Sequence, residues 1–245
     1  RVFDFFQRFR SQSITVAAAG NYDTEFLVGK LQDLRNGKRP SFIREPPIFN
    51  EQKTGIESRK DISQVYVAMA VPSVPFVDDR RYAVNIISSA LGGGMSSRLF
   101  LRLREKEGLV YNVQTFNEFF SDIGLLGIFF VTDQKNFPKC LEAIRDELLR
   151  VRYENFTEEE LSIHRALIKG NFLIGLENTS TRMLRLGRSL SQLGEIPSVA
   201  NVISNIESID QESVAPLLEK LCDPTRYSIA VVGSARPDDV RRFYQ

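Results

Sequence analysis

The stretch Leu91–Val113 reads LGGGMSSRLFLRLREKEGLVYNV and carries most of the information about the fold. Three consecutive glycines interrupt one helical pattern, and Ser96 or Ser97 is typical of the start of the next helix. Leucines at helical spacing follow until Gly108, a residue type that commonly ends helices. Residues 109–116 then alternate between apolar and polar side chains, which predicts a strand.

The segments next to this stretch predict further strands and a helix. Gln64–Val71 has the composition of a strand, and Asp78 or Asp79 is placed to cap the helix that leads into the glycines. Residues 123–131 predict another strand, which would pair with the strand at 109–116 as a hairpin.

The remainder of the chain is mostly helical in pattern. Thr157 and Glu160 have the spacing of a capping box, which marks a helix start. A last strand is expected at Tyr227–Gly233. A hairpin set among helices, instead of strict strand–helix alternation, predicts the α+β class with an antiparallel sheet covered by helices.

A strand–glycine–helix pattern occurs near both ends of the chain. The first copy is SITVAAAG, ending at Gly20, and the second is YSIAVVG, ending at Gly233. Such self-similarity indicates a duplicated architecture, although the pattern is common enough for a chance match. We therefore predict that residues 1–37 are the tail of a preceding homologous domain, 38–60 a proline-containing linker, and 61–245 a second domain.

Charge and composition exclude several classes of protein. The 32 basic and 31 acidic side chains leave a net charge of +1, so the basic excess of a nucleic-acid binder is missing. No apolar run reaches the ~18 residues of a membrane span. The two cysteines, Cys140 and Cys222, are far apart, which argues against a disulfide framework and a zinc ribbon and suits a reducing compartment.

The chain has one histidine, His164, which cannot supply a multi-histidine metal site. Glu160 and His164 share one helix face at i,i+4 spacing and could offer two ligands, but no third ligand stands near them in the sequence. An ordinary satisfied imidazole is the preferred interpretation. We expect no metal site on this chain.

The stretch at 91–113 resembles the second domain of the pitrilysin/insulinase family of zinc peptidases, which includes the mitochondrial processing peptidases. The family pattern is a glycine-rich turn, Ser-Ser-Arg-Leu, a helix ending in Leu-Arg-Glu-Lys, then Gly-Leu and Tyr. This chain has Leu91-Gly-Gly-Gly-Met-Ser-Ser-Arg-Leu99, Leu103-Arg-Glu-Lys106 and Gly108-Leu-Val-Tyr111. The resemblance extends more loosely over most of the chain and implies a processing-peptidase-like metallohydrolase domain.

The resemblance also implies a division of roles between paired domains. The first domain of the family holds zinc through a His-x-x-Glu-His helix, which this sequence lacks, and the second contributes an arginine and a tyrosine to the substrate. These fall on Arg104 and Tyr111 here. Without the family, Arg104 reads as a charge at a helix C-terminus and Tyr111 as a strand aromatic.

Other polar residues of the region have plainer interpretations. The amides of Gly92, Gly93 and Gly94 are candidates for peptide binding, with ordinary loop structure as the alternative. They lack the pattern of a phosphate-binding loop. Arg98, Arg102 and Lys106 are expected on a solvent-exposed helix face. Glu118 and Asp122, a conceivable acid–base pair, are expected to be solvated residues of the hairpin turn.

The resulting prediction is the C-terminal substrate-binding domain of a zinc metalloendopeptidase, inactive alone. Arg104 and Tyr111 would assist peptide binding and oxyanion stabilisation, and zinc would be held by an upstream domain or a partner subunit. The expected substrate is a peptide or unfolded protein, and a dimer is expected. A domain of a non-catalytic partner subunit and a purely structural relative are the alternatives. The sequence fixes no compartment; a bacterial cytoplasm or periplasm is the expectation.

Overall fold

A computed structural model gives the structure of the chain and describes residues 1–10, 14–32, 47, 53–59 and 61–245. The chain divides into two compact units. The smaller comprises Arg1–Glu45 and Gly170–Val199, and the larger comprises Pro46–Lys169 and Ala200–Gln245. Among the helices in the described ranges, none combines the length and apolar character that crossing a bilayer requires.

The larger unit is built on a five-stranded sheet in the order β1-β5-β2-β4-β3. The antiparallel sheet predicted from the sequence is therefore right for three pairings, whereas β1 and β5 run parallel at one edge. The strands are β1 Thr54–Glu57, β2 Gln64–Ser73, β3 Val110–Phe119, β4 Gly124–Asp133 and β5 Ser228–Val232.

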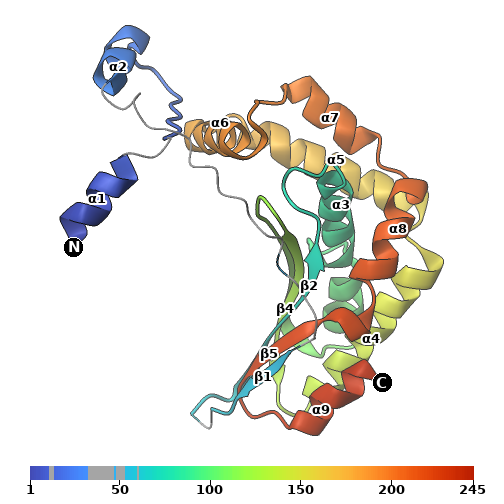
Figure 1. The fold of residues 1–245 in the computed structure, drawn as a ribbon. Helices are drawn as coiled ribbons and strands as arrows, with labels where there is room; N and C mark the ends of the chain where they lie inside the picture. The colour runs from blue at the N-terminus through green and yellow to red at the C-terminus, as the bar shows by residue number, and fades with distance from the viewer. Residues whose placement is uncertain (11–13, 33–46, 48–52, 60) are drawn as a thin grey trace. The chain divides into compact units, whose positions relative to one another are not determined.

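Helices cover one face of this sheet, and Figure 1 shows α3, α4 and α8 on that side. The core lies between them: Val65, Val67 and Met69 on β2 are buried, whereas Tyr66 on the opposite face is 40% exposed. We call that opposite face the open face. The helical elements are α3 Arg81–Gly92, η2 Phe100–Lys106, α4 Phe137–Glu154, α5 Glu158–Gly175, α7 Val199–Glu207, α8 Gln211–Leu221, η3 Pro224–Arg226, α9 Pro237–Arg241 and η4 Arg242–Tyr244.

Most predicted elements of this unit are confirmed, together with one of the two predicted caps. The Glu160 amide donates to Thr157 Oγ1 (3.2 Å), and the Thr157 amide donates to Glu160 Oε2 (2.7 Å), so the capping box exists. The prediction that Asp78 or Asp79 is the N-cap of α3 is wrong. Its N-cap residue is Arg80, without a side-chain cap, and Asp78 instead accepts from the Arg80 amide (2.9 Å).

The smaller unit contains α1 (Val2–Arg10), α2 (Thr24–Leu31) and α6 (Thr179–Leu193). Asp23 caps α2 by accepting from the Phe26 amide (3.0 Å). The strand expected at SITVAAAG is absent over residues 14–20, where the structure gives no pairing partner. Ser13 lies outside the described residues.

The two glycines that suggested a duplication share an unusual backbone conformation. Gly20 has φ of 128° and Gly233 has φ of 133°, backbone values that residues with a Cβ rarely adopt. A helix begins four residues after each glycine, at Thr24 and at Pro237. This likeness supports the duplication, and the assignment of residues 1–37 to a preceding domain stays a prediction.

The predicted linker extends too far. Residues 54–57, inside the range 38–60, form β1 and pair with β5 from Thr54↔Ile229 to Glu57↔Val232. Most of the remaining linker range lies outside the described residues. The end of the linker therefore falls no later than Lys53, because the next residues already belong to the sheet.

Candidate functional site

The candidate site is built on the corner segment, residues 98–111, which reverses the chain between η2 and β3. Leu99 and Leu103 are fully buried and fix the segment to the core. η2 is a π-helix, a wide and uncommon turn that occurs frequently at functional sites; its last bond runs from the Glu107 amide to Arg102 O (3.1 Å). Gly108, with φ of 60°, then allows the turn into the strand, as the sequence predicted.

Arg104 projects from η2 into solvent. Its guanidinium lies 5.9 Å from the centre of the Phe100 ring, one turn earlier, and this is a cation–π contact. Within the described part of the chain, Arg104 forms no ion pair with a carboxylate. A guanidinium in this state keeps its hydrogen-bond donors available for a ligand.

Tyr111 stands at an irregularity of the sheet. The register with β4 shifts between Val110 and Asn112, so Tyr111 is the extra residue of a β-bulge, a feature that redirects side chains. Its ring is 51% exposed, and its hydroxyl donates to Asp133 Oδ1 (3.0 Å). This hydrogen bond raises the pKa of Tyr111 above its ordinary value.

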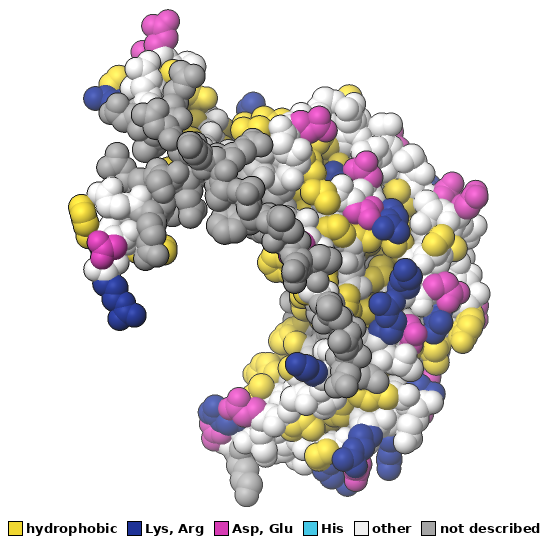
Figure 2. Space-filling model, in the orientation of Figure 1, with side chains coloured by type: hydrophobic (Ala, Val, Ile, Leu, Met, Phe, Trp, Pro, Cys, Tyr) yellow, Lys and Arg dark blue, Asp and Glu magenta, His cyan; other side chains and the backbone are white. Residues whose placement is uncertain are grey.

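The Tyr111 hydroxyl reaches the open face of the sheet. Asp133 is the cross-strand partner of Gln64, and paired residues share a face. Gln64 in turn accepts a hydrogen bond from the exposed Tyr66 (3.1 Å). Figure 2 shows hydrophobic side chains along the strands on the side away from the helices. Tyr111 therefore adds a polar group to the border of a largely apolar surface.

The structure thus leaves both predicted side chains exposed, and neither is sealed in the interior. No hydrogen bond joins Arg104 to Tyr111 among the residues that the structure describes. Their joint action on a substrate stays a prediction.

The three predicted glycines differ from one another. A Cβ on Gly92 would lie 2.7 Å from Thr115 Cγ2 and 2.9 Å from the Thr115 amide nitrogen, so α3 passes too close to β3 for a side chain. The Gly93 amide is already bonded to Ser89 O (2.9 Å) at the end of α3. Gly94 is exposed, and nothing lies within 4 Å of an added Cβ. Packing therefore explains why glycine stands at positions 92 and 93. Gly94 is the one of the three whose surroundings leave room for a ligand.

The expectation that Arg98 and Arg102 lie on a solvated face is wrong. The Arg98 side chain is 14% exposed and forms a bidentate ion pair with Glu160. The Nε–Oε1 distance is 2.6 Å and the Nη2–Oε2 distance is 2.8 Å. Glu147, only 3% exposed, lies 3.5 Å from Arg98 Nη1 and 3.6 Å from Arg102 Nη1. We call these four residues the ion network. Lys106 is exposed, as expected.

The electrostatic effect of this ion network is largest at Glu160. Burial raises the pKa of Glu160, but hydrogen bonds from Arg98 and from the Thr157 amide outweigh it and lower the pKa to about 2. A cavity of about 540 Å³ lies beside the network between η2, α4 and the start of α5. Arg104 is not among its lining residues, so the cavity and Arg104 are on different sides of η2.

Sequence reasoning missed Glu147 and Asp133. A signal existed for Glu147, because it occupies a core position of α4 together with Ile144, Leu148 and Val151, at i+3 and i+4 spacing. A carboxylate on such an apolar stripe requires a buried partner. No comparable signal marks Asp133, whose role depends on the bulge in the neighbouring strand.

The described residues do not fit a zinc site. His164 is buried, its Nδ1 lies 2.9 Å from Ser89 Oγ, and burial lowers its pKa, so it is the satisfied core imidazole that the sequence favoured. Burial raises the pKa of the Cys140 thiol to about 11 and that of Cys222 to about 12. Within the described ranges, no three potential ligands gather to hold a metal ion.

The positions of Glu118 and Asp122 give no support to the conceivable acid–base pair. Glu118 belongs to β3, opposite Leu125, and not to the hairpin turn as expected. Asp122 lies in the turn that connects β3 to β4.

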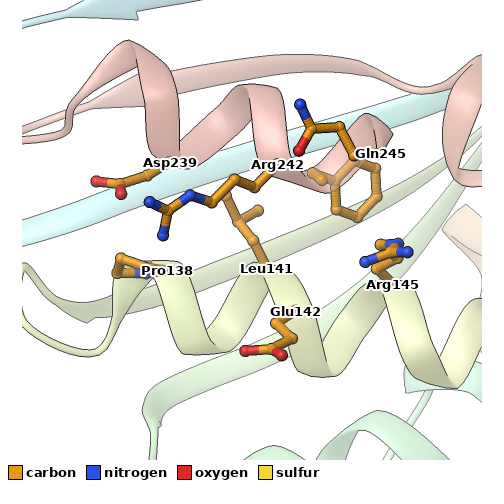
Figure 3. A pocket seen from close by; sticks show the side chains of 8 residues that line it. Pro138, Leu141, Glu142, Arg145, Asp239, Arg242 and Gln245 are labelled. Atoms are coloured by element: carbon orange, nitrogen blue, oxygen red, sulfur yellow. The ribbon is translucent and has the colours of Figure 1, made fainter.

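A second cavity, of about 360 Å³, lies between α4 and the helical turns after β5. Figure 3 shows the Arg242 side chain extending toward Asp239, with Arg145 near Gln245 and Glu142 pointing away. Asp239 is already paired with Arg236, at 3.2 Å. This cavity contains none of the predicted site residues.

Known proteins resemble this chain both in sequence and in fold. The model of the "Peptidase M16 inactive domain" matches residues 1–168. An uncharacterized zinc protease of Mycobacterium tuberculosis is 32% identical over 234 residues, covering 93% of this chain and 53% of the relative. Another, of Streptomyces coelicolor, is 30% identical over 240 residues, covering 94% and 52%. This chain thus spans about half the length of these curated relatives.

Solved structures share the fold. A peptidase M16 inactive domain from Pseudomonas fluorescens superposes with a TM-score of 0.79 at 18% identity, covering 95% of this chain and 58% of that one. A conserved protein from Enterococcus faecalis gives 0.75 at 18% identity, covering 94% and 54%. The match to the family model begins at residue 1, ahead of the predicted linker.

Proposed function

This chain belongs to the peptidase M16 family, as the inactive domain of zinc-protease-like proteins, and from that premise we propose that its corner segment binds an extended peptide beside a zinc ion held elsewhere. The zinc-bearing part would be another domain or a partner chain. We also propose that the protein acts as a dimer. The substrate would be a peptide or an unfolded protein.

One observation carries this proposal: a segment with a buried interior presents two long polar side chains to solvent. Leu99 and Leu103 hold the segment to the core, while Arg104 and Tyr111 stay exposed. Rigid support under exposed, hydrogen-bonding side chains is the arrangement that substrate positioning requires.

The two side chains offer different chemistry to a peptide. The Arg104 guanidinium can hold a backbone carbonyl or a carboxylate through two parallel hydrogen bonds. The Tyr111 hydroxyl can donate to the negative oxygen that develops on a carbonyl under attack. Because that hydroxyl now donates to Asp133, it must turn away from this carboxylate before it can donate to substrate.

No three potential metal ligands gather among the described residues, and the contribution proposed for this chain is binding and orientation of the peptide. We expect the isolated chain to bind no stoichiometric zinc and to cleave no peptide. Elemental analysis of the purified chain checks this; one tightly bound zinc per chain contradicts the proposal.

The decisive experiment changes the two side chains in the enzyme assembled with its zinc-bearing part. Tyr111→Phe should lower kcat by about 10²–10³-fold, the usual effect of losing an oxyanion donor. Arg104→Ala should lower kcat/KM, with a rise in KM because substrate is held less well. Both variants should assemble and unfold like the parent.

Tyr66→Phe is the matched control, because Tyr66 is also exposed on the open face and also donates to a side chain, Gln64. Its kinetics should match the parent. Full turnover in both Arg104→Ala and Tyr111→Phe, with assembly intact, would instead favour the structural alternative. Finding the zinc motif only on a separate partner subunit would favour the alternative of a non-catalytic subunit.

A further inference from the structure

We infer that Arg98 is a positioning residue, which acts through its ion pairs with Glu160 and Glu147 to hold η2 in the form that presents Arg104. The inference rests on the proposed function of Arg104 and extends it to a residue that does not contact substrate. It assigns a role to the ion network, which peptide binding at Arg104 and Tyr111 leaves unexplained.

The first step concerns how weakly η2 holds itself. A π-helix has wide turns and poorer packing than an α-helix, so it persists only where its surroundings fix it. η2 has seven residues, and of these only Leu103 is buried. Hydrophobic burial therefore anchors η2 at one residue. Polar contacts must fix the rotation of the helical turn about its axis.

The second step concerns what those polar contacts are. Arg98 stands two residues before the start of η2 and reaches the start of α5, where its bidentate pair with Glu160 is joined by a hydrogen bond to Asn155 O (3.2 Å). Its guanidinium also lies 5.0 Å from the centre of the Phe156 ring. A planar guanidinium held by several acceptors and a ring has one orientation, so it fixes the backbone from which it extends.

The third step concerns Glu147. Its carboxylate is almost fully buried on α4 and lies between Arg98, two residues before η2, and Arg102, inside it. A buried carboxylate requires a compensating cation, and here two arginines share that role. Arg102 is further held by Asp146 (3.3 Å) and Glu107 (3.1 Å). The network thus fastens one side of η2 to two other helices, and Arg104 extends from the other side.

The experiment uses Arg98→Lys in the assembled, zinc-loaded enzyme, alone and combined with Arg104→Ala. Lysine keeps the positive charge beside Glu147 but cannot form the bidentate pair. We expect kcat/KM to fall about 10–100-fold in the parent background, the effect of a small misplacement of a binding group. In the Arg104→Ala background the same change should cost less than about twofold, because the group being positioned is gone.

Amide hydrogen exchange of residues 100–106 gives a second measurement that does not depend on catalysis. Exchange should be faster in Arg98→Lys and in Glu160→Gln, a variant whose glutamine retains the capping box but loses the charge. Arg150→Lys is the control, since Arg150 borders the same cavity but pairs with the exposed Glu154 of its own helix. It should change neither exchange nor kinetics.

The outcomes separate the two claims. An equal loss of kcat/KM in both backgrounds, or unchanged exchange in residues 100–106, overturns the positioning role of Arg98. If Arg104→Ala keeps the parent kcat/KM, the proposed role of Arg104 fails, and faster exchange in Arg98→Lys then identifies Arg98 as a structural residue only. Non-additive kinetics together with faster exchange support the inference.

Discussion

Arg98 and Arg104 lie six residues apart on one segment and have opposite surroundings. The Arg98 side chain is mostly buried and meets Glu160, Glu147 and a backbone carbonyl. Arg104 is exposed, and among the described residues its one partner is the ring of Phe100. An arginine whose donors are all used stabilises the fold, whereas one held over a ring with its donors unused is ready for a ligand.

The comparison also separates the two sides of η2. The side toward α4 and α5 carries the ion network beside a cavity, and Arg104 is not among the residues that line this cavity. On the face of the molecule drawn in Figure 2, basic and acidic side chains are interspersed over the helices of the larger unit. Arg104 forms no ion pair with any described residue, whereas both arginines of the ion network do.

The largest expected effect tests this contrast directly. Arg98→Ala should lower the free energy of unfolding by about 3 kcal/mol, because it leaves the buried Glu147 with only Arg102 beside it. Arg104→Ala should change the free energy of unfolding by less than about 0.5 kcal/mol, as exposed substitutions usually do. Urea unfolding of the two variants and the parent measures both values. Similar losses for the two arginines would remove the distinction.

A smaller effect is expected where the segment begins, at the glycines. Gly92→Ala should lower the free energy of unfolding by about 1–2 kcal/mol, because the new methyl group meets the backbone of Thr115. Gly94→Ala, with open space around it, should leave stability unchanged within about 0.5 kcal/mol. Thermal unfolding compares them. A loss of peptide affinity in Gly94→Ala at unchanged stability would support the predicted role of the glycine amides in binding.

The pH dependence of stability sharpens the account of the ion network. The folded-state pKa of Glu160, about 2, lies below its ordinary value of 4.5, so its contribution is present above pH 4.5 and is lost as the pH falls toward 2. With solvent screening this amounts to about 1 kcal/mol. Glu160→Gln should lose that part of the acid sensitivity in unfolding curves at pH 6 and pH 3. An unchanged difference between the two pH values would show that the pair contributes nothing.

The sequence predicted the elements whose signals are local. The end of the helical pattern at Gly108 and the Thr157–Glu160 capping box follow from spacings within a few residues. It could not predict β1, a four-residue strand that forms only because β5, far along the chain, pairs with it. The strand expected before Gly20 failed for the converse reason, since a strand pattern without a partner makes no sheet.

Within the candidate site, the limit of sequence reasoning lies at charged side chains. Arg98 and Arg104 have the same residue type on one helical pattern, and only the packing of α4 and α5 distinguishes them. The exposure of Tyr111 follows from a bulge that strand alternation does not reveal. Glu147 could have been noticed, because a carboxylate on the apolar stripe of α4 requires a buried cation.

The smallest expected effect concerns the hydrogen bond that now occupies Tyr111. Asp133→Asn keeps an acceptor at the same place but removes the negative charge, so the pKa of Tyr111 should fall toward its ordinary value of 10. Titration of the tyrosine ring carbon by NMR, assigned with Tyr111→Phe, measures this directly.

The sign of this change connects the titration to the proposed function. A neutral acceptor holds the phenol proton less strongly than a carboxylate, so in Asp133→Asn the hydroxyl leaves its partner more easily. If Tyr111 donates to a substrate oxygen, kcat of the assembled enzyme should rise slightly, by up to about threefold, in Asp133→Asn. A fall in kcat together with a lowered pKa would mean that the charge of Asp133 is needed to hold the ring in place. Arg104 would then be the only group of the pair that is free in the absence of substrate, and the contrast with Arg98 would rest on it alone.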